Sequence, residues 1–319
     1  WRMRNPNGSM SLSASPMACS CVVYLCLGTD HFWPHYQQEK SVEFTEAEAT
    51  TERYGVAMYF EKLCAYLSEL PEVESIALGG SRAGARYDEK SDYDLYVYEK
   101  SPLSEETRLP ILKECCSYIE LGNHFWELED NCTLKDGIDI DILHRNLDAF
   151  SKDISSVVVD HVAHNGYTTC MWHNLLHSKI LFDREGKFRN LQEKYTVPYP
   201  SQLKKNVIER NMRLLSGNLP SYDKQIIKAL KRNDIVSVNH RTAAYMESYF
   251  DIIFAMNELT HPGEKRMVQI ALEQARVLPQ DFEKNLTALY QDLFAHPQNV
   301  EHDIVTLTEN LRLCLSTLA

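Results

Sequence analysis

The spacing of hydrophobic residues predicts that the chain changes from helix to strand near residue 71. Between Thr45 and Leu70, apolar side chains recur on one face of a helix: Val56, Phe60, Leu63, Cys64, Leu67 and Leu70. Pro71 cannot continue that helix, and a short strand is expected over Ser75–Leu78. The segment from Asp92 to Tyr98 alternates in the way typical of a strand. Asp92, Asp94 and Tyr96 would lie on one face of this strand, and the residues between them on the other face.

Further elements complete a mixed α/β region, and helices follow it. A helix is expected over Glu105–Ile119, and strands over His124–Glu129 and Ile138–Leu143. After Phe150 strand patterns largely disappear, and prolines separate the expected helices. These helices cover Asp153–His164, Thr169–Ile180, Ser201–Leu215, Ser221–Lys231, Ile235–Leu259, Glu264–Arg276, Gln280–Phe294 and Val300–Leu315. The predicted fold class is α+β, with a mixed sheet and flanking helices in residues 51–150 and a helical bundle in residues 151–319.

The first fifty residues differ from the rest of the chain. Arg2 and Arg4 precede an apolar run from Met17 to Leu27, which is typical of a signal-peptide core but too short to span a bilayer. We expect residues 1–50 to be a disordered or artefactual extension. The nine cysteines are irregularly spaced and form no CxxC pair, which favours reduced thiols and a cytoplasmic protein without a membrane segment.

The net charge limits the class of partner. The chain carries 45 acidic and 33 basic residues, a formal net charge of −12. Such a surface repels phosphate backbones, so a nucleic-acid partner is disfavoured, whereas one nucleotide carried with a metal ion is compatible.

Candidate chemistry lies in two short motifs. Gly79-Gly80-Ser81 follows the first predicted strand, and Asp92-Tyr93-Asp94 begins the second. Glycines let the backbone approach a ligand, and a serine hydroxyl with neighbouring N–H groups can hold phosphate oxygens. Two carboxylates on one strand face can share Mg²⁺, which proteins hold with carboxylates and substrate phosphates. Either motif alone occurs often as an ordinary turn or a solvated strand end.

A third acidic segment follows at Asp136-Gly-Ile-Asp139-Ile-Asp141, where Asp139 and Asp141 share a strand face. A carboxylate from a neighbouring strand would complete a two-metal cluster, or it would orient or deprotonate an acceptor hydroxyl. The order of strand, Gly-Ser turn, DxD strand and acidic strand is a more specific signal than any one of these parts.

This order resembles the signature of the DNA polymerase beta-like nucleotidyltransferase superfamily, which includes antibiotic nucleotidyltransferases. Within it, the chain is most similar to bacterial nucleotidyltransferase-like proteins with a C-terminal helical domain of unknown function. The resemblance covers about residues 55 to 315. It is carried by Trp126-Glu-Leu-Glu-Asp130, Lys135-Asp-Gly-Ile-Asp139, His164-Asn-Gly-Tyr-Thr168 and His261-Pro-Gly-Glu-Lys265.

The resemblance implies roles for individual residues. Asp92 and Asp94 would bind two Mg²⁺ ions, and Gly80 and Ser81 would hold the nucleotide phosphates. Asp141, which precedes Ile142-Leu143-His144-Arg145, fits the family's third carboxylate better than Asp139, which stays the alternate.

Basic side chains are the next candidates for the nucleotide. Lys265 resembles a lysine that antibiotic nucleotidyltransferases direct to the triphosphate, and a solvated surface lysine is the alternative. Arg82 and Arg86 lie between the serine turn and the DxD strand, where they would meet a phosphate or pair with Asp88 or Glu89.

Histidines offer a separate possibility. His173 and His177 share a helix face at spacing i, i+4, and His161, His164 and Cys170 lie nearby. A structural zinc site would use such ligands, but the spacing matches no zinc finger, so packing or a wall of the cleft is the favoured interpretation.

The sequence thus predicts a metal-dependent nucleotidyltransferase. It would move a nucleoside monophosphate from a nucleoside triphosphate, by default ATP, to a hydroxyl of a small molecule or protein, and release pyrophosphate. Two alternatives stay open: a non-catalytic nucleotide-binding regulatory module, and a toxin-type nucleotidyltransferase that acts on RNA or an antitoxin.

Overall fold

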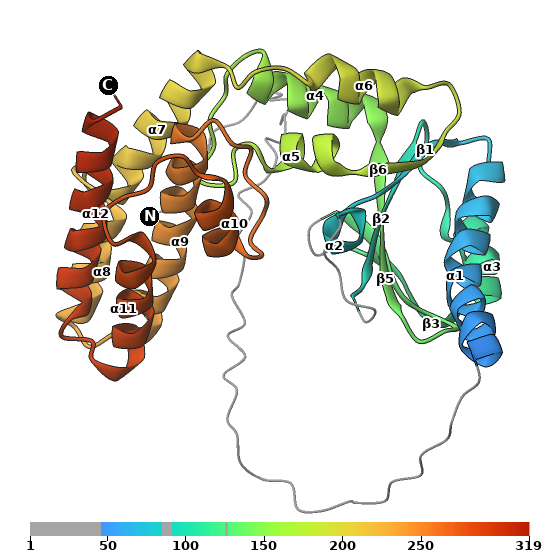
Figure 1. The fold of residues 1–319 in the computed structure, drawn as a ribbon, viewed down its shortest axis with the longest axis horizontal. Helices are drawn as coiled ribbons and strands as arrows, with labels where there is room; N and C mark the ends of the chain where they lie inside the picture. The colour runs from blue at the N-terminus through green and yellow to red at the C-terminus, as the bar shows by residue number, and fades with distance from the viewer. Residues whose placement is uncertain (1–45, 85–90, 125–126, 319) are drawn as a thin grey trace, which may run out of the picture. The chain divides into compact units, whose positions relative to one another are not determined.

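The structure, a computed structural model, describes residues 46–84, 91–124 and 127–318, and it is an α+β protein (Figure 1). The predicted class is therefore confirmed. The elements up to residue 146 are α1 (Glu46–Glu69), β1 (Val73–Leu78), α2 (Gly80–Ala83), β2 (Tyr93–Glu99), α3 (Glu105–Cys115), β3 (Cys116–Asn123), β4 (Leu128–Leu134) and β5 (Asp139–Asn146). The elements that follow are α4 (Leu147–Val158), α5 (Cys170–His177), β6 (Lys179–Asp183), α6 (Lys187–Tyr195), α7 (Ser201–Leu215), α8 (Tyr222–Leu230), α9 (Ile235–Met256), α10 (Met267–Gln274), α11 (Phe282–Ala295) and α12 (Val300–Ser316).

The strands form one mixed sheet in the order β3-β4-β5-β2-β1-β6. β2 and β5 run parallel at its centre, whereas the other neighbouring pairs are antiparallel. Parallel neighbours need a crossover connection, and here α3, β3 and β4 supply it. The register of the parallel pair sets Asp94 of β2 opposite Asp141 of β5.

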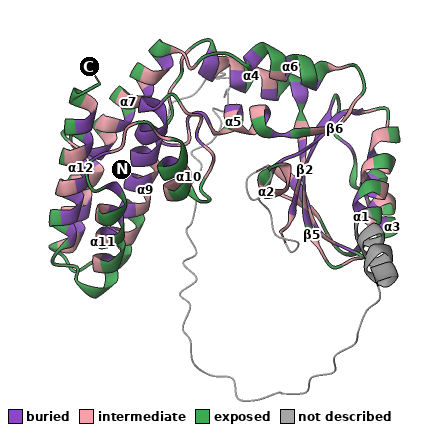
Figure 2. Ribbon diagram, in the orientation of Figure 1, coloured by how far each residue is buried: buried purple, intermediate pink, exposed green. Residues whose placement is uncertain are grey.

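The two faces of the sheet have different partners. Tyr93, Leu95 and Val97 of β2 point into a core shared with α1 and α3. Tyr96 and Tyr98, on the opposite face, join a second core with side chains of α4, α5 and α6. β2 is therefore almost entirely buried (Figure 2), and Asp94 is its one half-buried residue. The alternation along β2 thus sorts apolar side chains to the first core and leaves a carboxylate on the other face.

The sequence missed the two edge strands. The helix predicted over Glu105–Ile119 ends at Cys115, and β3 begins at the next residue. The helix predicted over Thr169–Ile180 ends at His177, and the five-residue β6 follows. An edge strand has one neighbour and exposes much of its length, so its apolar alternation is weak. β6 lies after Phe150, so the sheet contains strands from both predicted domains, residues 51–150 and 151–319. The domain boundary at residue 150 stays a prediction.

Two other predictions concern a strand that lies at a different position and a segment outside the described residues. The strand expected over His124–Glu129 lies later, as β4 over Leu128–Leu134. The extension predicted for residues 1–50 lies outside the described residues up to residue 45, as do Arg86, Asp88, Glu89 and Trp126.

A buried ionic network connects the strands on the face of the sheet that packs against α3. Arg108 Nε of α3 lies 3.2 Å from Asp130 Oδ2 of β4. His144 of β5 contacts Asp130 through Nε2 at 3.0 Å and Glu99 of β2 through Nδ1. Burial alone would lower the pKa of His144, but its hydrogen bonds to Asp130 and Glu99 raise it. The network therefore joins three strands and a helix behind the acidic face.

α9 is the central helix of the helical half, and every residue from Ser248 to Asn257 is buried. Its aromatic and aliphatic side chains pack with α8, α11 and α12. A helix that is apolar on all sides is typical of a core helix. No helix in the described part of the chain combines the length and the hydropathy needed to cross a membrane.

One carboxylate lies inside this apolar surrounding. Asp251 of α9 is 2% exposed and accepts hydrogen bonds from Thr168 N at 3.0 Å, Thr168 Oγ1 at 2.6 Å and Asn211 Nδ2 at 2.9 Å. Burial raises the pKa of Asp251 to about 7, against the opposing effect of these hydrogen bonds.

This pKa predicts a pH-dependent stability. Below about pH 4 Asp251 is protonated in both states, and as pH rises the unfolded chain releases its proton first. The free energy of unfolding should therefore fall from about pH 4 to about pH 7, by on the order of 4 kcal/mol for this one group. Urea unfolding of the wild type and of Asp251→Asn across this range measures the effect as their difference. A difference that stays constant with pH would contradict it.

Candidate functional site

The turn after β1 lies directly against β2. Gly79 N donates to Asp94 O at 2.8 Å, and Gly80 has φ +58°. A Cβ atom at Gly80 would lie 1.6 Å from Asp94 Oδ2, and one at Gly79 would lie 2.1 Å from the Tyr96 ring. A side chain at either position would have to displace Asp94 or Tyr96, and the left-handed backbone of Gly80 also favours glycine. The turn holds the Asp94 carboxylate close to the backbone that precedes Ser81.

Two other carboxylates act on Asp94. Burial is the main factor that raises its pKa, and the carboxylates of Asp92 and Asp141 raise it further, whereas the Lys265 ammonium lowers it. Asp141 is also the direct register partner of Asp94 across the parallel pair. Asp139 begins β5, is exposed, and accepts a hydrogen bond from Thr133 Oγ1 at 2.8 Å. The charges of Asp92, Asp141 and Lys265 thus all act on Asp94, whereas Asp139 is not among the groups that affect it.

Asparagine side chains, which the sequence did not single out, orient Asp141. Asn131 of β4 is the register partner of Asp141, and its Nδ2 donates to Asp141 Oδ1 at 2.7 Å. Asn131 Oδ1 in turn accepts from Asn123 Nδ2 at 2.6 Å. One oxygen of Asp141 is therefore fixed by an amide.

A fourth carboxylate lies on the same face. Glu129 of β4 is 8% exposed, and burial followed by the charge of Asp141 raises its pKa. From Asn131 to Leu134, polar and apolar residues alternate. This alternation is the signal that could have found Asn131, had the predicted strand extended beyond residue 129.

The donor set suits a hard divalent cation. Asp92, Asp94 and Asp141 supply carboxylate oxygens, which Mg²⁺ prefers, and the mutual repulsion of these groups would be relieved by a cation. Among the residues that the structure describes, no three His, Cys, Asp or Glu side chains converge closely enough to enclose a metal ion. Mg²⁺ normally uses one or two carboxylates together with substrate phosphates, and Asp94 with its neighbours fits that arrangement.

The basic side chains differ in their surroundings. Lys265 is exposed in the loop between α9 and α10. Arg82 Nε donates to Ser91 O at 2.6 Å, and its guanidinium lies 4.0 Å from the centre of the Tyr93 ring. Arg82 therefore connects the turn to the start of β2. Ser81 is half-buried in α2.

The histidines of α5 stack on each other. The rings of His173 and His177 are 3.9 Å apart. His173 Nδ1 lies 2.7 Å from Thr260 Oγ1, and His177 Nδ1 lies 2.8 Å from His173 O. Burial, followed by the neighbouring His177, lowers the pKa of His173 to about 4. These contacts join α5 to the loop that carries Lys265.

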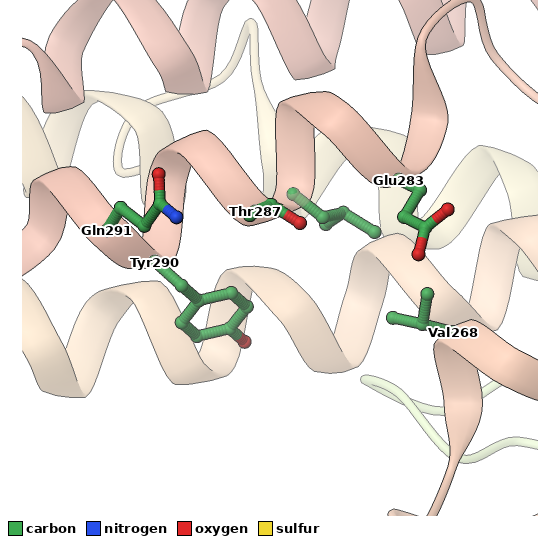
Figure 3. A pocket seen from close by; sticks show the side chains of 6 residues that line it. Val268, Glu283, Thr287, Tyr290 and Gln291 are labelled. Atoms are coloured by element: carbon green, nitrogen blue, oxygen red, sulfur yellow. The ribbon is translucent and has the colours of Figure 1, made fainter. Parts of the chain in front are cut away.

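Two cavities of about 370 and 670 Å³ lie between α10 and α11, and the smaller is shown in Figure 3. They share Val268, Glu283 and Tyr290. None of the residues predicted for the site lines either cavity.

Comparison with known proteins gives one partial family match. A family model described as a domain of unknown function (DUF4037) matches residues 168–267. No curated protein matches the chain. The matched segment contains α5 and Lys265, so it supplies the basic side chain that acts on Asp94.

Three solved structures show a distant similarity to the chain. A nucleotidyltransferase-like protein from Exiguobacterium sibiricum is 11% identical, with 84% of this chain and 75% of that chain covered and a TM-score of 0.37. An aminoglycoside 6-adenyltransferase from Bacillus subtilis is 9% identical, with 81% and 90% covered and a TM-score of 0.26. A CCA-adding enzyme in complex with ATP is 13% identical, with 85% and 84% covered and a TM-score of 0.27.

Two glycines provide a matched test of the turn. Gly80 and Gly137 both have positive φ, but a Cβ at Gly137 would meet nothing within 4 Å. Each alanine substitution should cost about 1–2 kcal/mol of backbone strain. Gly80→Ala should in addition displace the Asp94 carboxylate and weaken Mn²⁺ binding by about tenfold or more. Urea unfolding and titration calorimetry with Mn²⁺ measure the two effects, and equal Mn²⁺ affinity in both variants would contradict the proposed role of the turn.

Proposed function

We propose that this protein is a metal-dependent nucleotidyltransferase, which transfers a nucleoside monophosphate from a nucleoside triphosphate to a hydroxyl group. ATP is the expected donor, and a small molecule or a protein side chain is the expected acceptor. The observation that carries the proposal is the pairing of Asp94 with Asp141 across β2 and β5, against the Gly80-Ser81 turn. Lys265 and Asp92, which both act on Asp94, complete the group of charges.

The residues of the turn and the loop would bind the triphosphate. Gly80 leaves the backbone open to a close approach, and the Ser81 hydroxyl would donate to a phosphate oxygen. Lys265 would place its positive charge beside the triphosphate. Asp92, Asp94 and Asp141 would hold two Mg²⁺ ions, and these ions would neutralise the charge on the phosphate oxygens.

Asp141 would accept the proton of the attacking hydroxyl. The acceptor oxygen forms a bond to the α-phosphorus as the bond from that phosphorus to the pyrophosphate oxygen breaks. The hydroxyl proton passes to Asp141 and then to solvent. Asn131 holds one oxygen of Asp141 through a 2.7 Å hydrogen bond, so the carboxylate keeps a fixed orientation toward the acceptor.

The charge around Asp141 supports a neutral or cationic acceptor. Glu129 lies beside it, and Glu120 of β3 is the register partner of Asn131. A polynucleotide would bring further negative charge to this face and to a chain of net charge −12. A hydroxylated small molecule or a protein side chain meets less repulsion.

Carboxamide substitutions test the assignment. Asp92→Asn with Asp94→Asn should abolish nucleotide transfer, because the amides bind a hard cation poorly. Asp141→Asn should lower the rate by roughly 100-fold or more. Asp139→Asn is the matched control and should keep most of the activity, because Asp139 lies to one side of Asp94.

The measurement uses labelled ATP and Mg²⁺ with a panel of aminoglycosides, lincosamides and cell lysate, followed by mass spectrometry for a nucleotidyl adduct and assay of pyrophosphate. Full activity in the Asp92→Asn/Asp94→Asn protein would rule out the proposed site. Tight ATP binding without pyrophosphate release under all conditions would favour a non-catalytic nucleotide-binding module.

A further inference from the structure

Lys265 lies on a loop whose first residues are held by several hydrogen bonds. The loop connects α9, which ends at Met256, to α10, which begins at Met267 (Figure 1). At its start, Asn257 Nδ2 donates to Ile253 O and Val277 O, each at 2.9 Å. Asn257 Oδ1 accepts from Arg276 N and Val277 N. These bonds fix the beginning of the loop. The position of Lys265 therefore depends on the residues in the middle of the loop.

His261 occupies the middle of the loop and is completely buried. Its ring lies between Tyr167 and Phe254, with centroid distances of 4.7 and 4.9 Å. Its Nδ1 accepts a hydrogen bond from Gly263 N at 3.1 Å, and Gly263 has φ +99°. The side chain thus closes a turn over Pro262 that ends at Gly263, two residues before Lys265.

A neutral imidazole is required for this turn, because a protonated Nδ1 cannot accept a hydrogen bond. Burial, followed by the nearby His173, lowers the pKa of His261 to about 3. The ring is therefore neutral at physiological pH, with the proton on Nε2, and Nδ1 stays available to Gly263.

Residues just before and within α5 also hold the loop. His261 N donates to Thr169 Oγ1 at 2.8 Å, and Thr260 Oγ1 contacts His173 Nδ1 at 2.7 Å. Thr168 is bound through both its N and its Oγ1 to the buried Asp251. The start of α5 is therefore fixed to α9 and to the loop at the same time.

The same helix contacts the sheet beside Asp94. Asn174 Nδ2 of α5 donates to Tyr96 Oη at 2.8 Å, and Asn174 Oδ1 accepts from Arg145 Nη1 at 3.2 Å. The Arg145 guanidinium also lies 4.2 Å from the centre of the Tyr96 ring. Tyr96 follows Asp94 by two residues on the same strand face. α5 thus contacts the sheet through Asn174 and the loop through His173.

We propose that His261 is a positioning residue: its bond to Gly263 shapes the turn through which α5 and the loop hold Lys265 beside Asp94. This inference rests on the proposed function, since it takes Lys265 to be a ligand of the nucleotide triphosphate. His261 itself touches neither nucleotide nor metal. Its effect is transmitted through the backbone of residues 261–265.

Two substitutions at His261 separate the hydrogen bond from the packing. His261→Phe keeps an aromatic ring between Tyr167 and Phe254 but removes the acceptor for Gly263. His261→Asn loses the ring but keeps an acceptor, because asparagine bonds readily to a backbone N–H two residues ahead. His261→Phe should weaken the binding of ATP with Mg²⁺ by about fivefold to tenfold, and His261→Asn should restore most of the affinity.

The measurements are titration calorimetry with ATP and Mg²⁺, and hydrogen–deuterium exchange of residues 259–266. His261→Phe should speed exchange in this loop, whereas His261→Asn should not. Thr308→Val, which removes the bond to Tyr245 inside the helical bundle, is the control for a general loss of stability and should change neither measurement. Unchanged loop exchange in His261→Phe would overturn the proposal.

A double-mutant cycle tests the link to Lys265. If His261 acts through Lys265, the His261→Phe/Lys265→Ala protein should bind ATP no more weakly than Lys265→Ala alone. Fully additive losses would overturn the proposal and leave the nucleotidyltransferase assignment intact. If the wild type binds no ATP with Mg²⁺, the proposed function fails instead, and this inference fails with it.

Discussion

The parallel pairing of β2 and β5 is the constraint on which the candidate site depends. It sets Asp94 and Asp141 directly opposite each other at the centre of the sheet, where burial disfavours ionisation of Asp94 and the neighbouring carboxylates disfavour it further. An arrangement of this kind lowers stability unless positive charge compensates it. Lys265 supplies part of that charge, and a divalent cation bound with phosphate would supply more. The electrostatics of the sheet thus favour a ligand that brings a cation.

The surrounding structure prevents the carboxylates from moving apart. On the reverse face, His144 connects Glu99 and Asp130, which joins β2, β5 and β4 through one buried side chain. On the site face, Asn131 fixes Asp141, and the Gly80 backbone limits the space available to Asp94. Breaking a buried ion pair is costly because an uncompensated charge is left behind. The repulsion at the site is therefore maintained by interactions elsewhere in the sheet.

The sequence pattern singled out those candidate residues that lie on or beside the central strands. Asp94 stands out because its neighbours Tyr93 and Leu95 are core residues, so the alternation along β2 is clear. β3 and β6 were missed because they lie at the sheet edges. Asn131 was missed because the predicted strand stopped at Glu129. His261 has no periodic signal, since its role depends on Thr169, which lies 92 residues earlier in the chain. Contacts of that range are set by tertiary packing, which hydrophobic spacing does not encode.

On our proposal the two halves of the site have separate supports, and only one of them lies in the matched domain of unknown function. Residues 168–267 begin at Thr168, which bonds to Asp251, and they include α5, His261 and Lys265. On our proposal these residues hold one lysine beside a sheet whose carboxylates lie outside the matched segment. The sheet would provide the chemistry, while this segment would determine how firmly the triphosphate is held. Changes in the segment would therefore alter nucleotide affinity before they alter the reaction.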